Sequence, residues 1–185
     1  EAERAAMLEG INFGREMLGT LFQDNIAQRE SALRVSRRTF AAQRGRHLRL
    51  ILSDSCTLAC TYCFVDQGPK RNMSTEIADS AVQAWADELT ASDLGHSTIR
   101  FFGGEPLLNW PVMEHVIRSS SRRFPRGAVH WHLNTNGALL NAERVSLLRS
   151  LGDSLTVFLS CDGIGSANDR ERVHRNGKGS FHEVQ

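Results

Sequence analysis

Four short apolar segments, each followed by a glycine-rich or cysteine-containing motif, recur through residues 46–185 and constrain the fold more than any other feature. They occupy residues 47–53, 97–102, 128–134 and 154–160. Their lengths and their β-branched and aromatic residues predict strands. Helix signals lie between them, because Ser74 and Asn141 are suitable N-caps and Asn109 with Pro111 marks another helix start. Alternating strands and helices predict an α/β fold, with a parallel sheet and helices packed outside it.

The polar motifs stand where the predicted strands end. The first strand runs into DSCTLACTYCFVD, the second into GGEP, the third into TNG and the fourth into CDG. The carboxyl ends of parallel strands share one edge of a sheet, and α/β folds build their active sites at that edge. We therefore expect these four motifs, far apart in the sequence, to meet in space.

Composition and charge indicate an ordinary globular protein. The chain has 22 Lys and Arg against 21 Asp and Glu, a net charge of +1, so charge predicts neither nucleic-acid nor membrane binding. No apolar run approaches the ~20 residues that cross a bilayer, and no signal peptide opens the chain, so we expect a cytoplasmic protein. Residues 1–45 have apolar residues at helical spacing, interrupted by glycines, and predict a helical extension of the main domain at 46–185.

Three of the four cysteines, Cys56, Cys60 and Cys63, lie within eight positions. In a reducing compartment such crowding indicates metal binding or catalysis. A structural zinc site normally has four protein ligands, and strand alternation turns Cys161 toward the helices if Ser160 faces the interior. A histidine could still complete a zinc site. A four-iron, four-sulfur cluster on three thiolates, with one iron open to an outside ligand, accounts for the pattern better.

Together these motifs resemble those of the radical S-adenosylmethionine enzymes. The resemblance rests on C-x3-C-x-Y-C after the first strand and FFGGEP after the second. The later motifs SCDG and NDRERVHRNGKGSF are similar to the subgroup that modifies peptides and proteins, which includes sulfatase-maturating and SPASM-type enzymes. The resemblance covers residues 47–185 and implies a partial parallel (β/α) barrel, of which about four strand–helix units are present.

The resemblance also implies the cofactors. Cys56, Cys60 and Cys63 would hold a [4Fe–4S] cluster, and the amino and carboxylate groups of S-adenosylmethionine would chelate its open iron. One electron from an external reductant would split the sulfonium, and the resulting 5′-deoxyadenosyl radical would take a hydrogen atom from the substrate. The cofactor then carries out the difficult step, while the protein orients it and excludes water.

Cofactor contacts follow from the same resemblance. Glu105 would accept hydrogen bonds from the ammonium group of the cofactor, and Arg172 would pair with its carboxylate. Gly103 and Gly104 would allow a close backbone approach, and Ser160 would hydrogen-bond the cofactor. The alternatives are structural: a tight turn at GGEP and a solvated charge at Arg172.

Three further assignments are open to two interpretations. Tyr62 would pack beside the adenine or the cluster, or would be ordinary packing. Asn134 and Asn136 suit a cofactor-facing strand end, although Asn136 with Gly137 is also a common turn pair. In the third strand, His130 and His132 alternate with apolar residues and should face the barrel interior. There they could contact substrate or cofactor, or form a hydrogen-bonded pair.

Relatives of this type commonly have about six strand–helix units, and this chain supplies four, so we expect a fragment of a longer enzyme. A second cysteine cluster is absent from this sequence. Three functions stay open: a radical maturase of a ribosomally made peptide, a sulfatase-maturating type that acts on a Cys or Ser side chain, and a non-catalytic metal-binding module. The expected partners of an enzyme are a peptide or protein and an external one-electron reductant.

Overall fold

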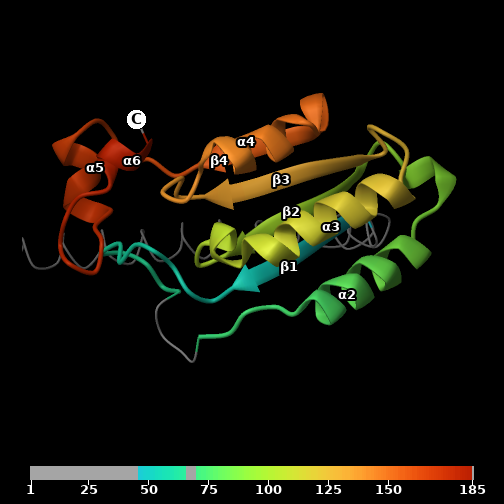
Figure 1. The fold of residues 1–185 in the computed structure, drawn as a ribbon, viewed down its shortest axis with the longest axis horizontal. Helices are drawn as coiled ribbons and strands as arrows, with labels where there is room; N and C mark the ends of the chain where they lie inside the picture. Colours follow the sequence, from blue (N-terminus) through green and yellow to red (C-terminus); the bar gives the residue numbers. More distant parts are fainter. Residues whose placement is uncertain (1–45, 66–69, 185) are drawn as a thin grey trace, which may run out of the picture. The chain divides into compact units, whose positions relative to one another are not determined.

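The computed structural model describes residues 46–65 and 70–184. The helical extension predicted at residues 1–45 lies outside the described residues. Within them, four parallel strands form a sheet in the order β1–β2–β3–β4 (Figure 1). The strands are β1 (His47–Ser53), β2 (Ser97–Gly103), β3 (Val129–Thr135) and β4 (Leu155–Leu159). The parallel α/β fold predicted from the sequence is confirmed, and each strand boundary agrees to within one residue.

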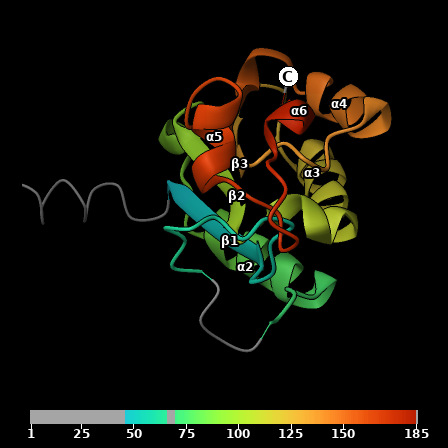
Figure 2. The same cartoon turned by 90° about the vertical axis from the view of Figure 1, so that its left-hand side faces the viewer.

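Three helices connect the strands and cover one face of the sheet (Figures 1 and 2). They are α2 (Thr75–Asp87), α3 (Trp110–Arg123) and α4 (Ala142–Arg149). Short 3-10 turns, η1 (Ala91–Asp93), η2 (Pro106–Asn109) and η3 (Gly152–Ser154), precede β2, α3 and β4. Two short helices, α5 (Ser166–Glu171) and α6 (Phe181–Val184), follow β4 and lie beyond the carboxyl ends of the strands.

Two of the predicted helix caps form as expected. The Ser74 hydroxyl accepts a hydrogen bond from the Ile77 amide, and the Asn141 side chain accepts one from the Arg144 amide. Asn109 precedes α3 but makes no capping bond. Its side-chain amide instead donates to the carbonyls of Leu52 and Met73, both at 2.9 Å. Asn109 thereby ties the start of α3 to the end of β1.

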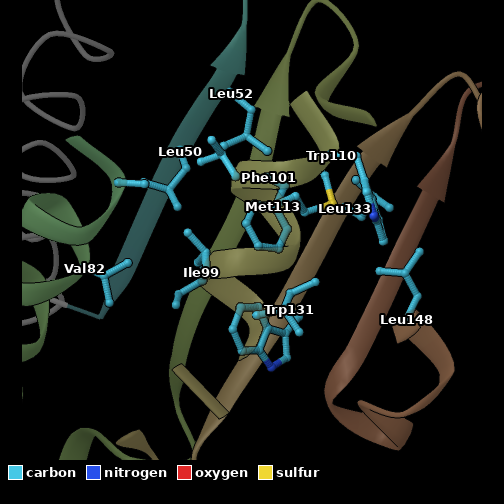
Figure 3. Close-up of a cluster of buried hydrophobic side chains, with 14 of the residues drawn as sticks. Leu50, Leu52, Val82, Ile99, Phe101, Trp110, Met113, Trp131, Leu133 and Leu148 are labelled. Carbon is cyan, nitrogen blue, oxygen red and sulfur yellow. The ribbon is translucent and has the colours of Figure 1, made fainter. Parts of the chain in front are cut away.

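The hydrophobic core lies between the sheet and these helices (Figure 3). Strand residues alternate, so that Leu50 is 1% exposed while its neighbour Ile51, on the other face, is 50% exposed. The core side chains come from β1, β2 and β3 and from each covering helix: Leu50, Leu52, Ile99, Phe101, Trp131, Leu133, Val82, Met113 and Leu148. This packing fixes the strands, and therefore the positions at which the polar motifs leave the sheet. None of the helices formed by the described residues is long and apolar enough to cross a membrane.

Candidate metal and cofactor site

The cysteine loop begins at the end of β1 and is held by the end of β2. The amide of Gly104 donates to the carbonyl of Ser53, and the amide of Glu105 donates to the carbonyl of Ser55, each at 2.8 Å. A Cβ atom on Gly103 would lie 2.3 Å from the Ser53 oxygen, and one on Gly104 would lie 2.4 Å from the Ser55 oxygen. The two glycines are therefore required by a close approach between two segments of the chain.

Glu105 is a buried carboxylate that joins the second and third motifs. It is 1% exposed. One oxygen accepts from the Leu107 amide at 3.0 Å and the Thr135 hydroxyl at 2.8 Å, and the other accepts from the Asn136 amide at 2.8 Å. Burial raises the pKa of Glu105, and these hydrogen bonds partly offset the rise. Three donors of the chain thus hold the carboxylate, and its contact with the cofactor ammonium stays a prediction.

The third motif reaches the first cysteine through Asn136. Its side-chain amide donates to Cys56 Sγ at 3.4 Å and to the Thr57 hydroxyl at 3.1 Å. The sequence assigned Asn136 only a general place at a strand end. Its position directly after β3, level with the residues that follow β2, was the available signal for this contact.

The cysteine loop also pairs with residues that lie far along the chain. The Ala59 amide donates to the Val173 carbonyl at 2.7 Å, and the Thr61 amide donates to the Glu171 carbonyl at 2.9 Å. Between these positions Arg172 is buried, with 8% of its surface exposed. The end of α5 therefore forms one wall of the loop.

Arg172 belongs to a polar network with Tyr62 and Asp162. Its guanidinium donates to the Tyr62 hydroxyl at 2.6 Å and lies 3.7 Å from the Asp162 carboxylate. The Tyr62 hydroxyl in turn donates to Asp162. Sequence reasoning found Tyr62 and Arg172 but gave no role to Asp162, although it follows β4 directly in the CDG motif. Tyr62 is 56% exposed, and these two hydrogen bonds join its hydroxyl to the fold.

The three cysteines of the loop line one cavity of about 130 Å³, together with Asp54, Leu58 and Lys70 among others. No three His, Cys, Asp or Glu side chains of the described residues are already gathered closely enough to hold a metal ion. The thiols would therefore have to converge on a cluster when it binds. Burial raises the pKa of Cys56 and of Cys60, while the Arg172 charge opposes the rise at Cys60. Thiolate ligation at these positions thus requires a cation to displace the protons.

The fourth cysteine lies away from this cavity, and its predicted orientation is wrong. Strand β4 ends at Leu159, so the alternation that would turn Cys161 toward the helices no longer applies. Cys161 is exposed, and its thiol donates to the Gly163 carbonyl at 3.1 Å. The neighbouring Ser160 is half-buried, and its amide donates to the Thr135 carbonyl at 2.9 Å.

The two histidines of β3 lie on the sheet face opposite the helices, each half-buried. They do not bond each other: His130 Nε2 donates to the Gly95 carbonyl at 3.0 Å, and His132 Nδ1 lies 3.0 Å from an Arg100 nitrogen. Asn134 follows on the same face, and its side-chain oxygen is buried without a hydrogen-bond partner among the described residues.

Residues 50–184 match the Radical SAM superfamily, a span that contains the second half of β1, the other three strands and the cysteine loop. The chain belongs to this superfamily. Radical SAM enzymes use a [4Fe–4S] cluster and S-adenosylmethionine, and the predicted cofactors are thereby confirmed at the level of the family.

Curated relatives of this radical SAM chain have several functions. An uncharacterized protein of Methanocaldococcus jannaschii is 30% identical over 73% of this chain and 44% of its own length. A GTP 3′,8-cyclase of a Synechococcus species is 35% identical over 65% of this chain and 33% of its own. The radical SAM cyclopropyl synthase TigE of Paramaledivibacter caminithermalis is 26% identical over 83% of this chain and 34% of its own. The chain thus spans less than half the length of these relatives.

Solved structures resemble the fold over a similar span. anSMEcpe with bound AdoMet and the Cp18Cys peptide has 27% sequence identity and a TM-score of 0.63. The match covers 75% of this chain and 37% of that one. The form of anSMEcpe with bound AdoMet alone gives a TM-score of 0.64. These matches support the radical SAM fold.

Gly104→Ala tests whether close packing of β2 against the cysteine loop matters for cluster loading. The added methyl group would overlap the Ser55 carbonyl, so we expect the loop to shift and iron content after anaerobic reconstitution to fall by about half or more. The control is Gly127→Ala, where a Cβ meets nothing within 4 Å. An alanine at position 127 would be strained, because φ there is +79°, but that variant should load iron normally. Full iron loading of Gly104→Ala would contradict the proposed constraint.

Proposed function

We propose that this chain forms the cluster-binding part of a radical SAM enzyme that takes a hydrogen atom from a peptide or protein substrate. The observation that carries the proposal is the gathering of Cys56, Cys60 and Cys63 around one cavity at the carboxyl edge of a parallel sheet. Three thiolates match a [4Fe–4S] cluster with one iron open, whereas a structural zinc site needs a fourth ligand. The exposed Cys161 does not line that cavity.

The surrounding residues suit S-adenosylmethionine. The buried, unpartnered oxygen of Asn134 lacks a donor that a bound molecule would supply, since buried polar atoms are nearly always paired. When bound, the cluster and S-adenosylmethionine supply a 5′-deoxyadenosyl radical that takes a hydrogen atom from the substrate. Arg172 would bind the carboxylate of the cofactor, held in place by Tyr62 and Asp162. Ser160, Gly103 and Gly104 would lie beside the same molecule, and Glu105 would accept a hydrogen bond from its ammonium group.

A peptide or protein substrate is favoured over a nucleotide by the extent of the matches. The anSMEcpe structure that holds AdoMet and a peptide matches 75% of this chain, and TigE matches 83%. The Synechococcus GTP 3′,8-cyclase matches 65%. A larger share of the chain therefore aligns with anSMEcpe and TigE than with the cyclase. The later motifs SCDG and NDRERVHRNGKGSF also resemble the subgroup that modifies peptides and proteins. Because anSMEcpe is of the sulfatase-maturating type, oxidation of a Cys or Ser side chain is the second candidate function.

Cysteine replacement tests the cluster. Cys56→Ala, Cys60→Ala or Cys63→Ala should remove most of the iron and abolish formation of 5′-deoxyadenosine from S-adenosylmethionine under dithionite, because each removes one of three thiolates. The matched control is Cys161→Ala, which should retain both. Iron and sulfide analysis with chromatography of the nucleoside gives the result. Iron loss in Cys161→Ala, with retention in one of the other three, would assign the ligands differently.

Isotope transfer tests the substrate. With peptides deuterated at carbon, incubated anaerobically with the reduced enzyme, deuterium should appear in 5′-deoxyadenosine, as measured by mass spectrometry. Peptides deuterated only at Cβ of Cys or Ser distinguish the sulfatase-maturating candidate. Of the two candidate functions, only oxidation of a Cys or Ser side chain requires removal of a hydrogen atom from that Cβ. If 5′-deoxyadenosine forms without deuterium even from peptides that are deuterated at every carbon, a peptide is not the hydrogen donor.

Arg172→Gln tests the position of the cofactor separately from the metal. A charge-assisted contact contributes roughly 1.5–3 kcal/mol, so S-adenosylmethionine binding should weaken about ten- to a hundredfold. Iron content should stay near that of the wild type. The exposed Arg170→Gln serves as the control and should change the affinity less than about twofold. Equilibrium dialysis under anaerobic conditions measures both. Wild-type affinity in Arg172→Gln would place the carboxylate of the cofactor elsewhere.

A further inference from the structure

The sheet face opposite α2, α3 and α4, here called the inner face, is basic. The strand residues on this face include two arginines, Arg49 and Arg100, and three histidines, but no Asp or Glu. In the parallel register Arg49 pairs with Arg100, and Arg100 pairs with His132. Neighbouring strands lie about 4.8 Å apart. The two guanidinium groups therefore leave adjacent strands on the same side of the sheet.

His132 does not compensate these charges. An Arg100 nitrogen lies 3.0 Å from His132 Nδ1, and a guanidinium has only donors, so Nδ1 accepts and the imidazole is neutral. Burial lowers the pKa of His132, and the Arg100 charge lowers it further. The His132 ring also packs edge-on against Phe158 at 5.5 Å. Arg100 is thus held in place by a neutral partner.

Among residues 46–65 and 70–184, Arg49 has no anionic partner either. Its guanidinium lies 5.4 Å from the centre of the Phe102 ring, and it is exposed. Across the described residues no carboxylate forms an ion pair with Arg49 or Arg100. Arginines elsewhere do pair, as Arg46 with Asp93 at 2.6 Å and Arg118 with Glu114 at 2.7 Å. Like charges opposite one another on neighbouring strands are destabilising. An anion bound to both guanidinium groups would relieve this repulsion.

We propose that Arg49 and Arg100 bind an anionic group of the substrate inside the barrel. Arg100 stands three residues before Gly103, the end of β2, which is about 10 Å below the edge that carries the cysteine loop. This proposal rests on the proposed function, under which the anion is a carboxylate of the peptide. An extended peptide that runs along β2 advances about 3.3 Å per residue, so its acidic side chain would lie about three residues from the residue that loses hydrogen.

Selection from a random peptide library tests the proposal, using the protein with its cluster and S-adenosylmethionine bound. Peptides retained by the wild type should be enriched in Asp and Glu. The double variant Arg49→Gln with Arg100→Gln should lose that enrichment, and Arg100→Glu should shift it toward Lys and Arg. The matched control is Arg122→Gln, an exposed arginine on α3, which should keep the acidic preference. Iron content of all four proteins should be equal.

A double-mutant cycle on one selected peptide separates recognition from structural damage. Replacing its acidic residue by the amide should weaken binding about tenfold or more with the wild type, and less than about twofold with the double arginine variant. Equal losses with both proteins, or selected peptides without acidic preference, would overturn the proposal while leaving a peptide substrate in place. If no peptide binds, GTP and tripolyphosphate are the next probes. Arginine-dependent binding of either keeps the anion site and refutes the peptide function, and no binding of any anion refutes the site.

Discussion

The buried carboxylate of Glu105 is the interaction on which the rest of the site depends. It leaves the end of β2 and accepts donors from Leu107, Thr135 and Asn136, so that one side chain fixes the ends of two strands and the start of η2. Removing a buried acceptor of this kind would leave three donors unsatisfied, each at a cost of about 1–3 kcal/mol. The bond to the Asn136 amide also fixes the residue whose side chain donates to Cys56. The carboxylate therefore acts on the first cysteine through one intermediate residue.

The cysteine loop has little internal structure and takes its shape from elements around it. The end of β2 holds its start, Asn136 holds Cys56, and the segment after α5 pairs with residues 58–61. These contacts join positions separated by as many as 116 residues, as between Leu58 and His174. Such long-range closure is entropically costly, and the packed core offsets that cost because it holds the strands from which these segments leave. A site of this type belongs to the whole sheet, since no single motif contains enough contacts to form it.

This arrangement explains how much of the site could be predicted from the sequence. Apolar alternation identified the strands because period-two patterning follows directly from the pleat, and motif spacing identified the three cysteines. The partners of Glu105 were not predictable, because a carboxylate placed after a strand can face either the cofactor or the chain. The same applies to Gly103, whose lack of a side chain indicates a close approach without identifying what approaches. The orientation predicted for Cys161 was wrong because β4 ends at Leu159, so strand alternation does not reach Cys161.

Electrostatics link the loading of the cluster to the order of the loop. Burial and the nearby Glu105 carboxylate both raise the pKa of Cys56, while the Asn136 and Leu58 donors lower it less. Without a cation the protein thus favours a neutral thiol beside a buried carboxylate. Iron of a bound cluster would reverse this preference at Cys56, because a thiol that coordinates a metal loses its proton. Because the cysteine side chains are not yet grouped closely enough to hold a metal ion, part of the free energy of cluster binding would go into bringing these thiols together.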